Sequence, residues 1–242
     1  MTLEGKCILV TRAREQSDEL AVAFRELGAD VRCLPYIEIR FIPFELPELS
    51  SLDLIVFTSK NAVDAFFRST NAISKNLDIL CVGSKTAQYL SKKSPESTPI
   101  IPQRFDSEGI IESLQERYED LSGLRVFCPQ AREARRDYVD FLESKGAIAL
   151  VAEAYSIEKL RPSESPGEDI DYVTFLSGRS VEAFVEAVPN AMDYLGARRV
   201  VVIGPVTKRK VETLGLRVDL MPAQASVEQI VEIVEKDVRS RE

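Results

Sequence analysis

The sequence predicts an α/β protein built from two doubly wound, parallel-sheet domains of the flavodoxin-like type, which arise from an internal repeat. Short apolar runs of strand length alternate with stretches of helical periodicity, as in successive βαβ units. Residues recur 118 positions apart, for example Gly28 with Gly146 and Ser59 with Ser177. We therefore expect each half to follow one plan of five strands with connecting helices.

The first βαβ unit opens the chain. We expect a strand, a helix and a second strand at residues 6–10, 16–27 and 31–34. Gly28 stands where a left-handed helix cap is needed. Arg12 and Arg14 follow the first strand, at the edge where open α/β sheets bind ligands. Either arginine could instead pair with a nearby acidic residue on the surface, and the sequence leaves this choice open.

The turn after the apolar run at residues 53–57 carries the clearest binding signal. The polar residues that follow this strand are Thr58, Ser59 and Asn61. A helical pattern begins directly after them, and N–H groups and small hydroxyls at a helix start can hold a carboxylate or phosphate. The equivalent turn of the second half contains Ser177, Gly178 and Arg179. Two copies of one turn suggest two facing halves of one site.

A second pair of turns follows the next strand of each half. The small residues after a strand at 78–82 are Gly83, Ser84 and Thr86. The repeat, now 121 positions apart, places Gly204 and Thr207 in the same way. This turn resembles the end of a phosphate-binding P-loop, but the first glycine is missing and Ser84 separates Gly83 from Lys85. We interpret it as a small-residue turn at a sheet edge rather than an ATP site.

The remaining segments are connections and closing helices. Residues 36–47 alternate in polarity and contain two prolines, which indicates an exposed extended connector. Residues 94–107 form a proline-rich loop around a short strand at 98–101, and a helix from 108 closes the first half. The second half restarts at Gly123, and Arg132 repeats Arg14. The last helix, at 226–238, begins with a capping box of Ser226 and Gln229.

Composition limits the function. A net charge of -8 and a pI near 4.9 argue against nucleic acid or an anionic membrane surface as a partner. The sequence contains no histidine, which removes the usual general base and a histidine-containing metal site. The four cysteines (Cys7, Cys33, Cys81 and Cys128) lie in or beside strand-like runs, and we expect buried, reduced thiols. With no apolar run of membrane-spanning length and no room for a signal peptide, we expect a cytoplasmic protein.

Several motifs together resemble the uroporphyrinogen-III synthase family, over nearly the whole chain. They are Thr11-Arg12, the turn at 57–63, Val82-Gly83 with Thr86-Ala87, Ala154-Tyr155, Phe175 with Ser177, and Ile203-Gly204-Pro205 with Thr207. The resemblance implies a lyase without a cofactor that dehydrates and cyclises hydroxymethylbilane to uroporphyrinogen III and inverts ring D. It also implies a discontinuous domain of residues 1–36 plus 158–242, a second domain of 37–157, a two-stranded hinge, and a substrate in the cleft between the domains.

The resemblance assigns roles to residues. Tyr155 is the candidate proton donor to the departing hydroxyl, since a phenol of pKa about 10 stays protonated at neutral pH. The expected substrate-binding residues are Arg12, Arg14, Thr58, Ser59, Asn61, Gly83, Ser84, Thr86, Arg132, Ser177, Gly178, Arg179, Gly204 and Thr207. Many family members carry an Arg-Gly and a Gly-Arg pair where this chain has residues 130–135, which weakens the case for close backbone approach there. Tyr155 could instead be a packed hinge tyrosine, and positioning alone could supply much of the rate.

Two other functions compete with this one. A non-catalytic two-domain sensor of small anions would suit the repeat equally well. A nucleotide-using transferase is disfavoured, because the chain lacks a GxGxxG motif and a complete P-loop. We expect a monomer whose partner is an anionic tetrapyrrole, with no metal and no nucleic acid or membrane. The sequence leaves open whether the enzyme that makes the substrate docks transiently to transfer it.

Overall fold

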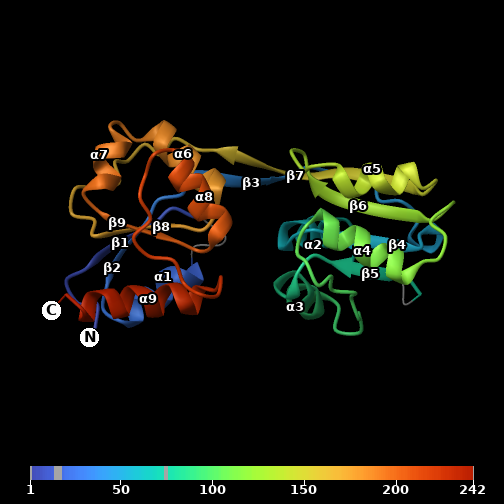
Figure 1. The fold of residues 1–242 in the computed structure, drawn as a ribbon, viewed down its shortest axis with the longest axis horizontal. Helices are drawn as coiled ribbons and strands as arrows, with labels where there is room; N and C mark the ends of the chain where they lie inside the picture. Colours follow the sequence, from blue (N-terminus) through green and yellow to red (C-terminus); the bar gives the residue numbers. More distant parts are fainter. Residues whose placement is uncertain (1, 14–17, 74–75, 242) are drawn as a thin grey trace. The chain divides into compact units, whose positions relative to one another are not determined.

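The structure is a computed structural model that describes residues 2–13, 18–73 and 76–241 (Figure 1). Its strands are β1 (Cys7–Val10), β2 (Asp30–Cys33), β3 (Ile37–Phe41), β4 (Leu54–Phe57), β5 (Asp78–Cys81), β6 (Arg125–Ala131), β7 (Ile148–Lys159), β8 (Tyr172–Phe175) and β9 (Arg199–Val202). Its helices are α1 (Asp18–Glu26), α2 (Lys60–Ser69), α3 (Ser84–Lys93), α4 (Ser107–Arg117), α5 (Asp137–Ser144), α6 (Gly178–Ala187), α7 (Ala191–Gly196), α8 (Pro205–Thr213) and α9 (Val227–Arg239). A short 3-10 helix, η2 (Leu49–Ser51), precedes β4.

The chain forms two compact units. Unit 1 comprises Met1–Ile39 and Ile157–Glu242, and unit 2 comprises Arg40–Ser156. One sheet has the strand order β2-β1-β8-β9, and the other has the order β3-β7-β6-β4-β5. The chain passes between the units along β3 and β7, which are neighbours in the second sheet. The predicted fold class, two doubly wound parallel sheets, is confirmed.

Unit 1 is a parallel sheet with helices on both faces. Successive side chains of β1 point to opposite faces, as the two-residue period of a strand requires. Ile8 and Val10 pack in the core formed with α1 and α9, whereas Cys7 and Leu9 pack in the core formed with α6, α7 and α8 (Figure 1). Both faces are apolar, so the strands are continuous hydrophobic runs rather than alternating ones.

Unit 2 repeats this arrangement. Leu54 and Val56 of β4 lie in the core formed with α4 and α5. On the other face, the ring of Phe66 in α2 lies 5.4 Å from that of Phe57 and 6.4 Å from that of Phe127, between ring centroids. Helices α2 and α3 pack together on this face (Figure 1). Helix α2 follows β4 directly and α3 follows β5 directly, so both helices start at the carboxyl ends of buried parallel strands. This is the edge of the sheet where α/β proteins place their sites.

Each sheet combines strands from both repeats. Strand β1 pairs with β8 in the first sheet, which joins β2-β1 to β8-β9, and β6 pairs with β4 in the second sheet, which joins β7-β6 to β4-β5. The same hydrogen bond is found where the strands of the two repeats meet in each sheet. In unit 1 the Cys7 N–H donates to Asp171 Oδ2 at 2.8 Å. In unit 2 the Arg125 N–H donates to Asp53 Oδ2 at 2.8 Å. These two bonds are related by the 118-residue repeat. The repeats have thus exchanged their first two strands.

The predicted connector at 36–47 is extended where it forms β3, but the expectation that it is exposed is wrong for its first two residues. Ile37–Phe41 forms β3, and Tyr36 is buried. The reason is packing, because the ring centroid of Tyr36 lies 4.8 Å from that of Phe184 in the core of unit 1. Gly28 does adopt the left-handed conformation expected of a helix cap, with φ 92°. The predicted start of the first helix, Gln16, lies outside the described residues.

Two further expectations are also corrected. Cys33 is exposed rather than buried, because it ends β2 at the edge of its sheet, whereas the other three cysteines are buried as expected. The fifth strand of each half is reduced to a single bridge, Leu80 with Ile100 and Val201 with Leu220. Of the five strands expected in each half, four are therefore regular and the fifth is one bridging residue, and the first half contains β3 in addition.

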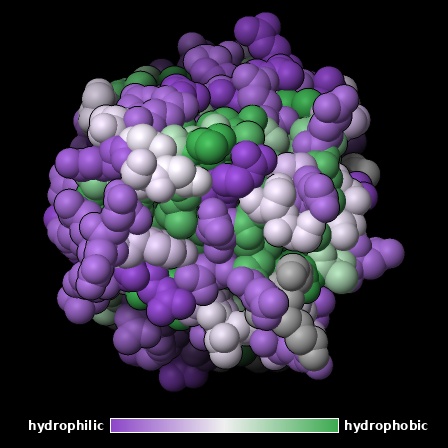
Figure 2. Space-filling view, turned by 90° about the vertical axis from the view of Figure 1, so that its right-hand side faces the viewer, coloured by the Kyte–Doolittle hydropathy of each residue, from purple (hydrophilic) through white to green (hydrophobic). Residues whose placement is uncertain are grey.

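The surface is mixed in character. Hydrophilic side chains dominate the face drawn in Figure 2, and apolar patches on it are separated by polar residues. Across the described ranges, every helix is too short or too polar to cross a membrane.

Candidate functional site

Four helices begin at the carboxyl ends of adjacent strands, two in each unit. In unit 2, β4 leads to α2 and β5 leads to α3. In unit 1, β8 leads to α6 and β9 leads to α8. The N-cap residues of these helices are Ser59, Gly83, Ser177 and Gly204. Each start presents backbone N–H groups at the positive end of a helix dipole, which favours a bound carboxylate.

The serine caps have nearly the same geometry in both units. Ser59 Oγ accepts the N–H of Ala62 at 3.1 Å, and Ser177 Oγ accepts the N–H of Ser180 at 3.2 Å. Both serines are half-buried at the end of a fully buried strand. Thr58 and Asn61 flank the first cap, and Gly178 and Arg179 follow the second; these four residues are also half-buried. The repeat seen in the sequence thus corresponds to a repeated cap.

The other two N-caps, Gly83 and Gly204, have no side chain to cover the backbone N–H groups of the helix start. Gly83 has φ 92°, a conformation that other residues rarely adopt, whereas Gly204 is fully extended. Ser84 is exposed in the first turn of α3. Thr86 is buried and donates its hydroxyl to the Val82 carbonyl at 3.2 Å, and Thr207 is likewise buried. These two threonines sit within the helix starts and not on their surface.

Tyr155 lies beside the first serine cap. Its hydroxyl oxygen is 2.9 Å from Ser59 Oγ, and either group can be the donor. The tyrosine is 5% exposed, and its backbone carbonyl accepts the N–H of Arg132 at 2.8 Å. The sequence separates Tyr155 from Ser59 by 96 residues. The structure therefore brings together the predicted proton donor and one predicted binding residue within unit 2.

The predicted cations differ in how they are held. Arg12 is half-buried after β1, and burial lowers the pKa of its guanidinium while Glu19 opposes that shift. Arg179 Nη1 donates to the Ile157 carbonyl at 3.3 Å. Arg132 is exposed and pairs with Glu153 at 3.0 Å. Arg14 lies outside the described residues.

The end of β1 is fixed by two buried threonines. Thr11 Oγ1 donates to the Thr174 carbonyl at 2.7 Å, and Thr174 Oγ1 donates to the Leu9 carbonyl at 3.0 Å. Because these bonds join β1 to β8, they hold the residues that follow each strand in a fixed register. Arg12 follows β1 and the Ser177 cap follows β8, so both belong to one edge of unit 1.

Lys210 was not among the residues predicted from the sequence. A Cβ on Gly178 would lie 3.2 Å from Lys210 Cγ, so this stem covers the start of α6. Its ammonium pairs with Glu182 at 2.6 Å. The pattern 208–210 favours a solvated helix face, and only the packing of α6 against α8 shows that Lys210 points to the cap.

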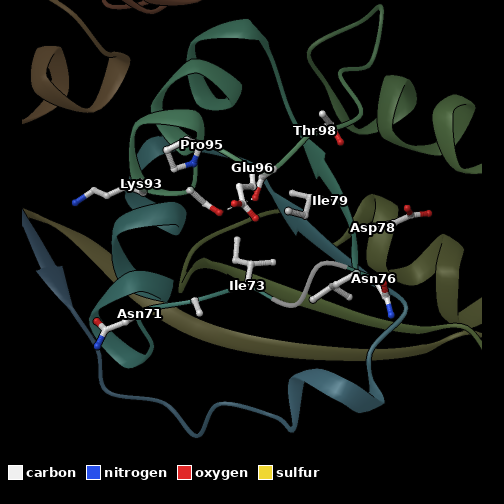
Figure 3. Close-up of a pocket in the computed structure, with 13 residues that line it drawn as sticks. Asn71, Ile73, Asn76, Asp78, Ile79, Lys93, Pro95, Glu96 and Thr98 are labelled. Carbon is white, nitrogen blue, oxygen red and sulfur yellow. Dashed lines mark hydrogen bonds between the residues drawn. The ribbon is translucent and has the colours of Figure 1, made fainter.

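A pocket of about 870 Å³ in unit 2 lies elsewhere (Figure 3). Its lining includes Asp78 at the start of β5 and Lys93 at the end of α3. Gly83 follows the other end of β5, so this pocket is at the opposite edge of the sheet. It contains none of the residues predicted to bind substrate.

The buried thiols are not suited to nucleophilic chemistry. Burial raises the pKa of the Cys81 and Cys128 thiols to about 12, so both stay protonated at neutral pH. In the part of the chain that the structure describes, no cluster of acidic or cysteine side chains could hold a metal ion. The chemical groups at the helix starts are N–H donors, hydroxyls and a phenol.

The chain is similar to proteins of one family. A sequence profile described as uroporphyrinogen-III synthase HemD matches residues 18–232. The uroporphyrinogen-III synthase of Synechococcus elongatus is 28% identical, over 98% of this chain and 97% of its own. The structure of uroporphyrinogen-III synthetase from Helicobacter pylori matches 96% of this chain and 99% of its own, with TM-score 0.66 and 15% identity. A mutant uroporphyrinogen III synthase from Thermus thermophilus matches 98% and 100%, with TM-score 0.64 and 16% identity.

Proposed function

Because the chain belongs to the uroporphyrinogen-III synthase family, we propose that it dehydrates and cyclises hydroxymethylbilane to uroporphyrinogen III with inversion of ring D, and without a cofactor. The observation that carries this proposal is the family match, which spans residues 18–232. The arrangement of groups in both units agrees with such a reaction, since it offers donors for an anionic substrate and a phenol for proton donation.

The substrate binds mainly through short donors in this proposal. A linear tetrapyrrole with acetate and propionate groups is strongly anionic, and the protein carries a net charge of -8. Long-range attraction is therefore absent, and affinity has to come from contacts at close range. The four helix starts supply N–H groups and hydroxyls for the carboxylates, and Arg12, Arg132 and Arg179 supply cations. Both units contribute to binding.

Tyr155 assists the departure of water. The bond that breaks joins the hydroxymethyl carbon to its oxygen, and the pyrrole nitrogen supplies the electrons that leave an azafulvene cation. The departing hydroxyl needs a proton or a hydrogen bond. Ser59 Oγ already accepts the Ala62 N–H, and its own proton can be donated to the tyrosine oxygen at 2.9 Å. In that state Tyr155 donates its O–H to the departing hydroxyl when substrate is bound, and Ser59 fixes its direction.

One assay tests the proposal. The protein is incubated with freshly made hydroxymethylbilane, and the uroporphyrinogen isomers are separated after oxidation to porphyrins. We expect isomer III in excess over the isomer I that forms without an enzyme. Formation of isomer I alone, at the uncatalysed rate, would show that the function is wrong.

The sensor alternative has no support among the relatives, whose names are those of synthases. We propose that the protein acts as a cytoplasmic monomer with residues 1–36 plus 158–242 and 37–157 as its domains. Supporting observations are the two compact units, with boundaries near 39 and 157, and three buried cysteines that form no disulfide. Cell fractionation tests the location, size-exclusion chromatography tests the oligomeric state, and limited proteolysis tests the domain boundaries.

A further inference from the structure

Two large apolar side chains are far more exposed than the other large apolar side chains that the structure describes. Val206 is 71% exposed and Phe105 is 61% exposed, whereas the other large apolar side chains that the structure describes as exposed reach 49% at most. Single exposed apolar side chains are common on protein surfaces, so the position of these two carries more information than their exposure. Both residues lie at helix starts that the proposed function uses.

Phe105 covers the start of α3. A Cβ built on Gly83 would lie 3.5 Å from Cγ of the Phe105 ring, so the ring rests on the glycine cap itself. The ring precedes Asp106, whose Oδ1 accepts the N–H of Gly109 at 2.9 Å and caps α4. Arg104, on the other side, pairs with Asp106 at 3.1 Å and with Glu108. The backbone around Phe105 is therefore fixed on both sides.

Val206 has a corresponding place in unit 1. It is the second residue of α8, directly after Pro205 and the Gly204 cap. The cap is covered there by a much smaller side chain, because a Cβ on Gly204 would lie 3.6 Å from Ala225 Cβ. Ala225 and Phe105 thus cover equivalent glycine caps, and each unit has one prominent apolar side chain beside its cap.

A role in folding alone does not explain why Phe105 and Val206 are so exposed. Phe105 stands at the position before the α4 cap, where an apolar residue commonly packs on the fourth helical residue, here the buried Ile110. Such packing favours a buried side chain, yet Phe105 is 61% exposed. Val206 has no packing role of this kind, since it is more exposed than any other large apolar side chain the structure describes.

We propose that Phe105 and Val206 contact the pyrrole rings of the bound substrate, one ring-contact residue in each unit. This inference rests on the proposed function. A pyrrole with acetate and propionate arms has a flat apolar face next to anionic groups, so it needs an apolar surface beside N–H donors. The start of α3 with Phe105 and the start of α8 with Val206 each provide that combination. The two residues act in binding and orientation and take no part in proton transfer.

The test measures KM and kcat for hydroxymethylbilane with Phe105→Ala, Phe105→Leu and Val206→Ala. We expect KM to rise about tenfold for Phe105→Ala, less for Phe105→Leu, and about threefold for Val206→Ala, with a larger share of isomer I at limiting substrate. Val22→Ala is the matched control, because Val22 is also an exposed helical valine but belongs to α1. Its KM should stay at the wild-type value.

Thermal melting separates binding from folding. Phe105→Leu keeps an apolar residue before the α4 cap, so a raised KM with an unchanged Tm supports ring contact. Wild-type KM in Phe105→Ala and Val206→Ala would overturn the inference while leaving the proposed function intact. If the wild-type protein forms no isomer III, the proposed function itself fails, and the inference fails with it.

Discussion

The turns at Ser59 and Ser177 are copies of one structure with different neighbours. Each serine caps a helix at the end of a buried strand, with cap bonds of 3.1 and 3.2 Å. In unit 2 the Ser59 hydroxyl also meets the Tyr155 hydroxyl at 2.9 Å. In unit 1 the Ser177 hydroxyl donates to Ser180 Oγ at 3.2 Å. The residue that corresponds to Tyr155 in the repeat is Ile37, which has no hydroxyl.

This difference suggests how a duplicated protein divides its work. Both caps keep the donors that hold an anionic group, since these come from backbone N–H groups that any sequence supplies. Among the described residues, only the Ser59 cap is hydrogen-bonded to a phenol, the group we propose as proton donor to the leaving hydroxyl. We therefore expect binding to be shared by the units and proton donation to belong to unit 2.

The largest effect should come from Tyr155→Phe. Removing the phenol hydroxyl should lower kcat by on the order of tenfold to a thousandfold without unfolding the protein, because the ring stays in place and only the donor is lost. Steady-state kinetics and a melting curve measure both quantities. Tyr89→Phe is the control, since it removes a phenol of unit 2 that donates to Asp64 at 2.7 Å, away from the Ser59 cap. Unchanged kinetics in Tyr155→Phe would remove this residue from the mechanism.

A smaller effect is expected in unit 1 from Arg12→Ala. If this unit only binds, KM should rise about tenfold while kcat at saturation stays near the wild-type value. Arg25→Ala serves as control, because Arg25 lies in the last turn of the following helix and donates to the Val31 carbonyl. A fall in kcat as large as that of Tyr155→Phe would place chemistry in unit 1 as well.

The two caps should be alike in stability. Ser59→Ala and Ser177→Ala should each lower the free energy of unfolding by about 1 kcal/mol, because each leaves one N–H at the helix start without its acceptor. Urea denaturation provides the measurement, and Ser226→Ala at the equivalent cap of α9 should give a similar loss. A loss at Ser59 several times that at Ser177 would mean that the Tyr155 contact is mainly structural.

The smallest effect concerns an ion pair between the first residue of a strand and a helix. In unit 2 the strand supplies the acid, and in unit 1 the strand supplies the base. Asp78 starts β5 and accepts from Arg117 Nε at 3.1 Å, whereas Arg199 starts β9 and donates to Asp237 at 2.6 Å. Arg117 holds the pKa of Asp78 below its ordinary value of 3.8. A depressed carboxyl pKa stabilises the fold above that ordinary value, and the contribution disappears as the pH falls through the folded pKa.

Asp78→Asn should therefore be less stable than the wild type at pH 7, by less than about 1 kcal/mol for a partly exposed pair, and the difference should shrink below pH 4. Melting curves at several pH values would show this trend. A difference that persists unchanged at pH 3 would assign the loss to something other than the ionised carboxylate.

Much of the fold could be predicted because local signals repeat. Gly28 and Gly146 both adopt positive φ after a helix, and Ser59 and Ser177 both cap one. These features depend on a few neighbouring residues and so leave a pattern in the sequence. The position of Tyr36 depends on Phe184, far along the chain, and no periodicity within 36–47 could predict its burial.

In the candidate site, too, contacts between residues far apart in the sequence could not be predicted. The four helix starts could be located from strand and helix patterns, but the contact of Tyr155 with Ser59 joins residues 96 positions apart. Phe105 lies in a proline-rich loop, and its place on Gly83 follows from how α4 is capped and not from any motif. Arrangements of this kind depend on which elements pack together, and that information is absent from a local pattern.

The division of labour between the units is tested most directly by single-turnover kinetics with enzyme in saturating excess over hydroxymethylbilane. Under these conditions binding is complete and the observed rate reports the chemical step. We predict that Ser59→Ala slows this step about tenfold or more, because Tyr155 loses the partner that directs its proton, whereas Ser177→Ala stays within about twofold of the wild type. Equal rates in the two variants would contradict the account.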